Sequence, residues 1–156
     1  QPQFPLEISM YQRILIATDG SELSDKAVHS GLQLAALCGA EVVALKVIPH
    51  YPRNYFEGGL PIEAADIERV EQQWRAQAQA LVDKIRSAGE GEGVKVSSIL
   101  AKSDLVAEAI IETARQHGCD LIVMASHGRK GIQRLLLGSE TQHVLTHSHV
   151  SVLVLR

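Results

Sequence analysis

The amino-acid sequence predicts an α/β fold, in which a five-stranded parallel sheet is covered by helices on both faces. Short runs of Ile, Leu and Val alternate with longer segments of helical periodicity along the chain. Strands and helices that alternate in this way form parallel sheets through right-handed crossovers. Aromatic residues make up only 4% of the sequence, so the core must consist of aliphatic side chains, as is typical of helices packed on parallel strands.

Each expected strand is a short apolar run bounded by turn signals, and each expected helix has apolar side chains three or four residues apart. Ser21 or Ser24 would cap the first helix and Gly39 would end it. The glycines from Gly89 to Gly93 are expected to break the second helix. In chain order, we expect a strand at 13–17, a helix at 21–39, a strand at 41–48, a loop at 50–61, a helix at 67–88, a strand at 94–101, a helix at 104–117, a strand at 121–124, a helix at 139–146 and a strand at 150–155.

The chain of 156 residues fits one domain. At this length a chain buries about two-thirds of its surface on folding, so the core needs no disulfide or metal ion. Met10 stands just before the first periodic segment. We therefore expect the domain to span residues 10–156, and residues 1–9 to be an added segment or a disordered arm.

Composition argues against two classes of partner. The net charge of −3 offers no concentrated positive face for nucleic acid. No apolar run approaches the roughly 20 residues that a membrane-spanning helix needs. Cys38 and Cys119 lie far apart, without a CxxC motif, which favours a reducing compartment and hence a cytoplasmic location.

Two segments place polar and glycine residues where ligands bind in open α/β sheets, which is at the carboxyl ends of the strands. Residues 17–20 follow the first strand, and residues 125–131 follow the fourth. Gly138 and Ser139 then open a helix, whose N–H groups and positive dipole end suit an anion. A phosphate cradle and a glycine-rich turn before an ordinary helix both fit this pattern. The cradle would also use Ser126, Gly128, Arg129, Lys130, Gly131 and Arg134.

The same segments resemble the universal stress protein family. Ala125-x-x-Gly128, nine further residues and Gly138-Ser139 are similar to that family's G-x2-G-x9-G-[S/T] nucleotide loop, except at the first glycine. The runs at 14–21, 124–128 and 152–154 also look like the family's strands and turns, so the resemblance covers residues 10–156. It implies a three-layer, doubly wound sheet of order 3-2-1-4-5, with the reversal between the first and fourth strands.

The resemblance also implies a binding site for ATP with Mg²⁺ or Mn²⁺. Asp19 would accept a hydrogen bond from the adenine amino group, although an Asp at a strand end also commonly caps the next helix. The backbone of Val47 would face the same base. The base and ribose would be lined by Ala17, Thr18, Met124 and Ala125, and the phosphates would lie near Ser126, His127, Gly128, Gly138, Ser139, Glu140 and Thr141.

Two of these residues are unfavourable for the expected ligand. The family loop has glycine where this chain has Ala125, and a Cβ there would crowd the ribose or disfavour a positive φ. The carboxylate of Glu140 would repel phosphate unless its side chain turns away and only its amide is used. An interaction protein that binds no nucleotide therefore remains an alternative.

Other chemistries have weaker support in the sequence. Ser126 lacks the G-x-S-x-G context of a hydrolase nucleophile, because Met124 occupies the first glycine position, and no P-loop motif occurs. His143 and His147 lie one helical turn apart without a nearby carboxylate or cysteine, so we expect no metal site there. A slow ATP hydrolase stays open as an alternative to the regulatory stress-response module that we expect, with His127 or Glu140 as its candidate base.

The last strand predicts a homodimer. From Val150 to Leu155 it carries neither charge nor proline, and it is apolar on both faces. In a sheet of the implied order this strand lies at an edge, where exposed N–H and C=O groups invite pairing. Many members of the family dimerise through this strand. The chain's own N-terminal arm is the alternative cover.

Overall fold

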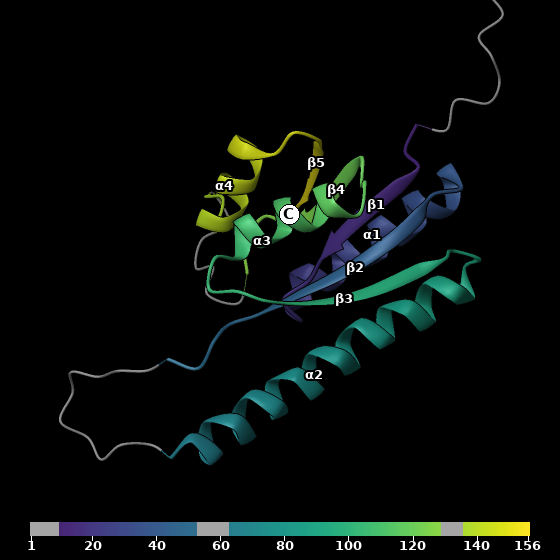
Figure 1. Ribbon diagram of the computed structural model, residues 1–156. Helices are drawn as coiled ribbons and strands as arrows, with labels where there is room; N and C mark the ends of the chain where they lie inside the picture. The colour runs from purple at the N-terminus through teal and green to yellow at the C-terminus, as the bar shows by residue number, and fades with distance from the viewer. Residues whose placement is uncertain (1–9, 53–62, 129–135) are drawn as a thin grey trace, which may run out of the picture.

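A computed structural model describes residues 10–52, 63–128 and 136–156 (Figure 1). The N-terminal segment 1–9, most of the expected loop after the second strand, and Arg129, Lys130, Gly131 and Arg134 lie outside the described residues. Along the chain the elements are β1 (Arg13–Ala17), α1 (Glu22–Cys38), β2 (Glu41–Ile48), α2 (Ala64–Gly91), β3 (Val96–Lys102), α3 (Val106–Gln116), β4 (Leu121–Ala125), α4 (Ser139–His147) and β5 (Ser151–Leu155).

The five strands form one parallel sheet of order β3-β2-β1-β4-β5, which confirms the expected fold class (Figure 1). The central strand β1 pairs with β2 on one side and with β4 on the other: Ile14 lies opposite Val42 in β2 and opposite Leu121 in β4. The strand order therefore reverses between β1 and β4, as the family resemblance implies.

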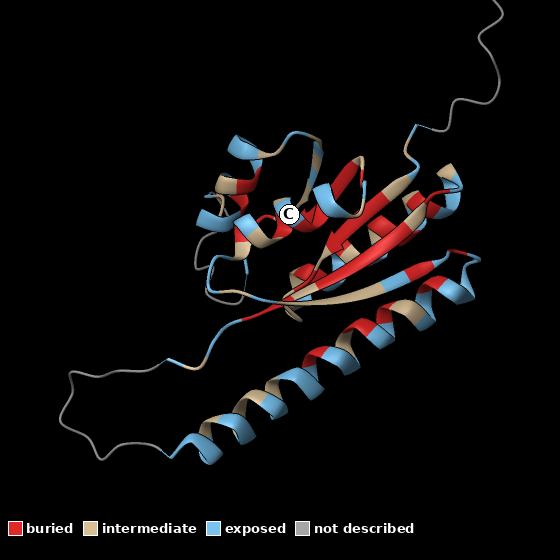
Figure 2. Ribbon diagram, in the orientation of Figure 1, coloured by how far each residue is buried: buried red, intermediate tan, exposed pale blue. Residues whose placement is uncertain are grey.

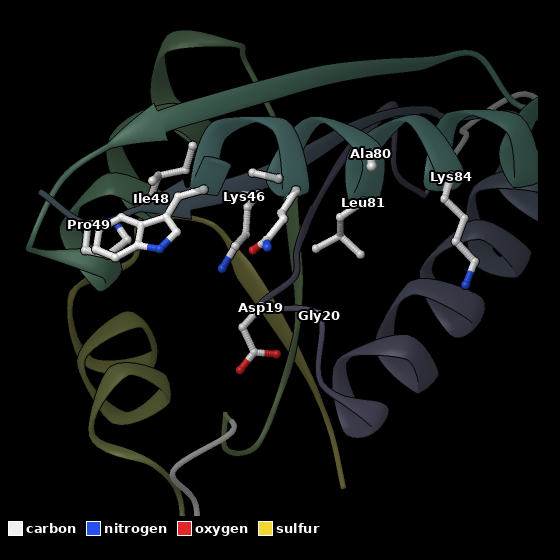
Figure 3. Close-up of a pocket in the computed structure, with 11 residues that line it drawn as sticks. Asp19, Gly20, Lys46, Ile48, Pro49, Ala80, Leu81 and Lys84 are labelled. Carbon is white, nitrogen blue, oxygen red and sulfur yellow. The ribbon is translucent and has the colours of Figure 1, made fainter. Parts of the chain in front are cut away.

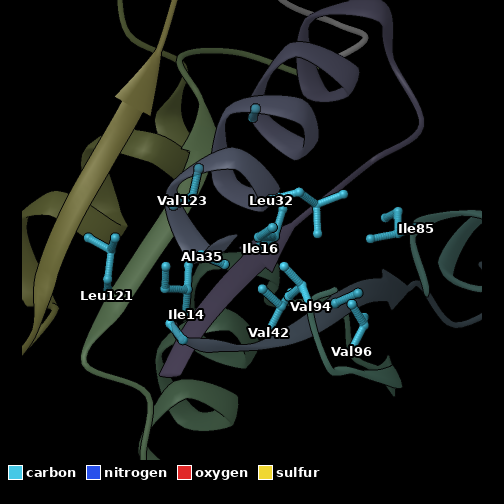
Figure 4. Close-up of a cluster of buried hydrophobic side chains, with 13 residues drawn as sticks. Ile14, Ile16, Leu32, Ala35, Val42, Ile85, Val94, Val96, Leu121 and Val123 are labelled. Carbon is cyan, nitrogen blue, oxygen red and sulfur yellow. The ribbon is translucent and has the colours of Figure 1, made fainter. Parts of the chain in front are cut away.

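The helices cover the sheet in two pairs. α1 and α2 pack on one face, where Ile14 and Ile16 of β1 contribute to a core cluster that includes Leu32 of α1 and Ile85 of α2 (Figure 4). α3 and α4 pack on the other face, where Leu15 of β1 joins a second cluster. Because successive side chains of a strand point to opposite faces, one strand supplies both cores. The central strands are buried, whereas the outer side of α2 is exposed (Figure 2).

The expected end of the second helix was wrong, because α2 continues through Gly89 to Gly91. Gly89 is buried, and a Cβ added to it would overlap the Val96 side chain of β3. This glycine therefore permits a close approach of helix and strand instead of ending the helix. The break falls at Gly93, whose φ is +76°.

The third helix begins two residues later than expected, at Val106. Asp104 lies just before it and accepts a hydrogen bond from the backbone N–H of His50 at 2.8 Å. This bond holds the pKa of the Asp104 carboxyl below its ordinary value. It also joins the start of α3 to the chain just after β2.

No helix in the described part of the chain is long and apolar enough to cross a membrane.

Candidate functional site

The carboxyl ends of β1, β2 and β4 surround a cavity of about 160 Å³, which we call the strand-end cavity. Its volume is smaller than the 300–1,000 Å³ common for whole small-molecule sites. Of the predicted site residues, Ser126, Gly138 and Ser139 do not line it. The remaining predicted residues do: Ala17, Thr18, Asp19, Val47, Met124, Ala125, His127, Gly128, Glu140 and Thr141.

The turn after β1 fixes the position of Asp19. Its Oδ1 accepts a hydrogen bond from the N–H of Ser21 at 2.9 Å. Ser21 is the N-cap of α1 and accepts from the N–H of Ser24 at 3.2 Å, so the cap is Ser21 and not Asp19. Asp19 Oδ2 lies 2.6 Å from where a Cβ on Gly128 would stand. Gly128 therefore has to be glycine if the Asp19 carboxylate is to stay in this position.

Thr18 is buried beneath this turn. Its Oγ1 lies 2.9 Å from Ser24 Oγ and accepts from the N–H of Gly20 at 3.2 Å, while its own N–H donates to the Leu45 carbonyl at 3.0 Å. These bonds occupy the hydroxyl within the protein. Thr18 thus shapes the wall of the strand-end cavity.

Two hydrogen bonds hold the start of α4 against the end of β4, and a third joins the end of β4 to β5. The N–H of Gly138 donates to the Ser126 carbonyl at 2.8 Å, and the N–H of Ser126 donates to the Leu155 carbonyl at 2.7 Å. The buried hydroxyl of Thr141 donates to the Ala125 carbonyl at 2.9 Å. The N-terminus of α4 is therefore fixed beside the reversal point of the sheet.

The N-cap residue of α4, Gly138, supplies no side-chain hydrogen bond to the first turn. Within the described residues, the backbone N–H groups of this turn therefore have no side-chain acceptor. Together with the positive end of the helix dipole, they favour an anion. A Cβ on Gly138 would lie 3.3 Å from His127 Cα, so the glycine also lets this turn pack on the backbone after β4.

Glu140 directs its carboxylate away from the first turn of its own helix. Its Oε2 accepts a hydrogen bond from the N–H of Ala107 at 2.9 Å, in the first turn of α3. Leu105, the N-cap residue of α3, has no side-chain cap of its own, so Glu140 takes over that role. The Glu140 carboxylate thus points toward α3, and only the backbone amide of Glu140 would meet a phosphate at the start of α4.

Ala125 is an ordinary strand residue. It is the last residue of β4 and pairs with Leu155 of β5. No residue other than glycine has a positive φ in the described part of the chain. The alanine in place of the family's glycine therefore brings no backbone strain.

Sequence reasoning missed several residues of the strand-end cavity. Lys46 is the one with a visible signal, because it is a charged residue among the apolar side chains that follow Glu41 in β2. Val106 and Ile110 stand four residues apart on α3, and only the packing of that helix brings them to the cavity. Ser24 and Leu45 complete the set that was not predicted.

Other candidate groups do not form a reactive centre among the residues that the structure describes. No three His, Cys, Asp or Glu side chains gather there as a metal ion would require. The His143 and His147 rings lie 4.3 Å apart, between centroids, on α4. Burial raises the pKa of the Cys119 thiol to about 11, so it is not a thiolate nucleophile near neutral pH.

Comparison with known proteins agrees with this fold. A model described as the universal stress protein family matches residues 10–156. Universal stress protein MJ0531 of Methanocaldococcus jannaschii is 32% identical over 148 residues, which cover 95% of this chain and 84% of that protein. Universal stress protein YxiE of Bacillus subtilis is 26% identical over 149 residues, 94% of this chain and all of that protein.

Solved structures show the same architecture. Universal stress protein UspA from Lactobacillus plantarum superposes with a TM-score of 0.79 at 22% identity, over 94% of this chain and 98% of that chain. A universal stress protein in complex with cAMP superposes with a TM-score of 0.69 at 25% identity, over 94% and 97% of the two chains. With the family model matched along nearly the whole chain, this protein belongs to the universal stress protein family.

Proposed function

We propose that this chain is a regulatory stress-response module that holds ATP, with Mg²⁺ or Mn²⁺, at the carboxyl ends of β1 and β4. The observation that carries the proposal is the first turn of α4, which lacks a side-chain cap and is fixed beside the strand-end cavity. Such helix termini bind phosphate readily. A family member with 25% identity to this chain is known in complex with cAMP, which is also an adenine nucleotide.

The strand-end cavity would take the base and ribose. At about 160 Å³ it is too small for a whole nucleoside triphosphate, so the phosphates would extend along the start of α4. Asp19 would accept from the adenine amino group while its Oδ1 keeps its bond to Ser21. Met124 and Ala125 line the cavity beside it and would contact the ribose.

The phosphates would be bound by backbone N–H groups of Ser139, Glu140 and Thr141. Thr141 would contribute only its amide, because its hydroxyl already donates to Ala125. A divalent ion would bridge the phosphate oxygens and neutralise their charge. It would rest on the nucleotide, since the described residues offer no cluster of three metal-binding side chains.

The test combines identification and affinity. Mass spectrometry of nucleotide released by denaturing the purified protein should detect ATP. In calorimetry, the double variant Gly138→Val, Ser139→Ala should bind Mg·ATP at least about tenfold more weakly, because a side chain at 138 presses on the turn and blocks close approach of phosphate. Gly91→Val is the matched control, as a Cβ at 91 meets nothing within 4 Å. Unchanged affinity in the double variant would remove the α4 turn from the site.

The two alternatives give different results in the same assays. A slow hydrolase would release phosphate from bound ATP, but the Glu140 carboxylate is engaged with Ala107, which leaves His127 as the candidate base. His127 Nδ1 lies 3.2 Å from Ser126 Oγ. An interaction protein without a ligand would release no nucleotide and show no heat on addition of ATP.

A reducing compartment, and so a cytoplasmic location, forms part of the proposal. Cys38 and Cys119 are both free thiols in the structure, and they belong to opposite faces of the sheet. Neither is therefore placed to form an intrachain disulfide.

A further inference from the structure

A larger cavity of about 640 Å³ lies along α2, separate from the strand-end cavity (Figure 3). We call it the α2 groove. Its volume falls within the 300–1,000 Å³ of ordinary small-molecule sites. The groove is lined by Asp19, Gly20, Lys46, Ile48, Pro49, Trp74, Gln77, Ala78, Ala80, Leu81 and Lys84.

The α2 groove and the strand-end cavity lie on opposite faces of the sheet. Leu45 and Val47 of β2 belong to the core beneath α3 and α4 and line the strand-end cavity. Ile48 points the other way, toward α2, and lines the groove. Asp19 and Lys46 line both, at the place where the two cavities meet above the strand ends.

The floor of the groove is apolar over a considerable length. Trp74, Ala78 and Leu81 follow one another at helical spacing along α2 and face the groove together with Ile48. Trp74 also stacks on Tyr51, with ring centroids 6.1 Å apart. From Trp74 to the far end of the groove, α2 advances ten residues, or about 15 Å. A compact ligand would leave much of this surface uncovered.

Positive charge stands at two points of the groove. Figure 3 shows Lys46 near Ile48 and Pro49, and Lys84 at the opposite end, with Leu81 between them. Lys84 is exposed and forms no ion pair with a described residue. Against these two lysines the lining contains one carboxylate, Asp19, whose Oδ1 is bonded to the Ser21 amide. The lining therefore favours a negatively charged ligand.

We propose that the α2 groove is a second ligand site, which binds an elongated organic anion with an apolar body. The body would lie on Leu81, Ala78 and Ile48, with its aromatic or aliphatic end against Trp74. A carboxylate, sulfonate or phosphate group would lie at Lys84, one helical turn from Ala80. The groove shares Asp19 and Lys46 with the strand-end cavity, but none of its α2 residues lines that cavity, so a ligand lying along α2 would not occupy the nucleotide site.

The probe is 8-anilinonaphthalene-1-sulfonate, an aromatic anion whose absorption overlaps tryptophan emission. Trp74 is the only tryptophan of the chain, so energy transfer from this single donor reports binding of the probe to the domain, and competition with ATP and the variants below place it. We expect saturable, one-to-one quenching of Trp74, which persists in the presence of saturating Mg·ATP. Loss of the probe on addition of ATP would place it in the strand-end cavity and overturn the second site.

Ala80 offers a matched pair of variants. It is exposed, lines the groove and lies outside the strand-end cavity, so both variants should fold. Ala80→Glu should weaken probe binding about five- to tenfold and Ala80→Lys should strengthen it, because each places a charge beside the bound sulfonate. Lys84→Gln should weaken binding in the same direction. Lys95→Gln, the same charge change at an exposed residue just before β3 that pairs with Glu41 and lies outside the groove lining, should have no effect.

The role of the anionic group is tested with N-phenyl-1-naphthylamine, which keeps the rings but lacks the sulfonate. It should bind more weakly than the sulfonate and should not respond to Ala80→Glu or Ala80→Lys. Equal affinities for the two probes, or equal affinities of the two Ala80 variants for the sulfonate, would overturn an anion site in this groove.

Discussion

The Asp19 carboxylate is held by the turn that begins α1, and this fixes which of its oxygens can meet a ligand. Oδ1 is bonded to the Ser21 N–H, and Oδ2 lies toward Gly128 at the strand-end cavity. An adenine amino group facing Oδ2 would donate to it. Guanine presents a carbonyl at the same position, so two acceptors would face each other.

Replacement of Asp19 should therefore change base selectivity. The unmodified protein should prefer ATP to GTP by about ten- to a hundredfold, the worth of a hydrogen bond to a charged group. In Asp19→Asn the Ser21 N–H would hold the amide oxygen, and the amide NH₂ would stand in place of Oδ2 and favour GTP. Competition binding with both nucleotides measures this ratio. Equal binding of ATP and GTP by the unmodified protein contradicts the role of Asp19.

Replacing Glu140 should lower the stability of the fold without changing the affinity for ATP. Glu140→Ala removes the side-chain acceptor that the described residues provide for the first turn of α3, and should lower the free energy of unfolding by about 1 kcal/mol. Affinity for ATP should change little, because the carboxylate faces away from α4. Urea denaturation and calorimetry on the same variant measure the two effects. A large gain in ATP affinity would mean that the carboxylate repels the phosphates.

These two residues also show where sequence reasoning ends. The sequence places Asp19 and Glu140 correctly at strand and helix ends, because turn and cap residues act locally. It does not specify the direction of the Glu140 side chain, which depends on the packing of α3 against α4. The same holds for Ala125, whose backbone conformation follows from its place in β4.

At the scale of secondary structure, α2 contains a matched pair of glycines. Gly89→Ala should lower the free energy of unfolding by about 1–3 kcal/mol, because the new methyl group overlaps Val96. Gly91→Ala should raise it by about 0.5–1 kcal/mol, because alanine is the better helix former and its Cβ meets nothing within 4 Å. Thermal denaturation of both variants tests the pair. Stabilisation by Gly89→Ala would show that α2 does not approach β3 this closely.

The same helix shows why β1 and β2 were predicted correctly while the end of α2 was not; β3, expected at 94–101, lies at Val96–Lys102. Arg13–Ala17 and Glu41–Ile48 were predicted with the observed bounds, since short apolar runs between polar turns are distinctive. Glycine was interpreted as a helix breaker at 89, where it in fact serves close packing. The α3 residues of the strand-end cavity and the α2 groove depend on contacts between distant segments, so local sequence patterns contain little information about them.

At the scale of the whole molecule, β5 leaves one side of the sheet open. Among the described residues it pairs with β4 alone. On the β4 side, the Leu155 carbonyl accepts a hydrogen bond from the N–H of Ser126. In a parallel strand the backbone groups of alternate residues point to opposite sides. Since the Leu155 carbonyl faces β4, the N–H and C=O groups of Leu153 face β4 as well. The N–H and C=O groups of Val152 and Val154 point to the open edge. The exposed side chain of Leu153 adds apolar surface there.

We expect a homodimer in which two β5 strands pair antiparallel across a two-fold axis. Val152→Pro removes an outward N–H without breaking the β4 ladder, so it should yield a folded monomer. Val152→Ala keeps the N–H and should remain dimeric. Light scattering at about micromolar concentration measures the mass of each. A stable monomer for the unmodified protein would rule out this dimer.

The pairing of β1 with β4 has a consequence for how the chain folds. β1 can pair with β2 as soon as about 30 residues have closed a loop, whereas β4 follows β1 by about 100 residues, and contacts so distant in sequence form late. The strand-end cavity, which needs both β1 and β4, is therefore completed near the end of folding. Interactions that form after the transition state slow unfolding and leave the folding rate almost unchanged. A nucleotide bound there would lengthen the lifetime of the folded chain without hastening its formation.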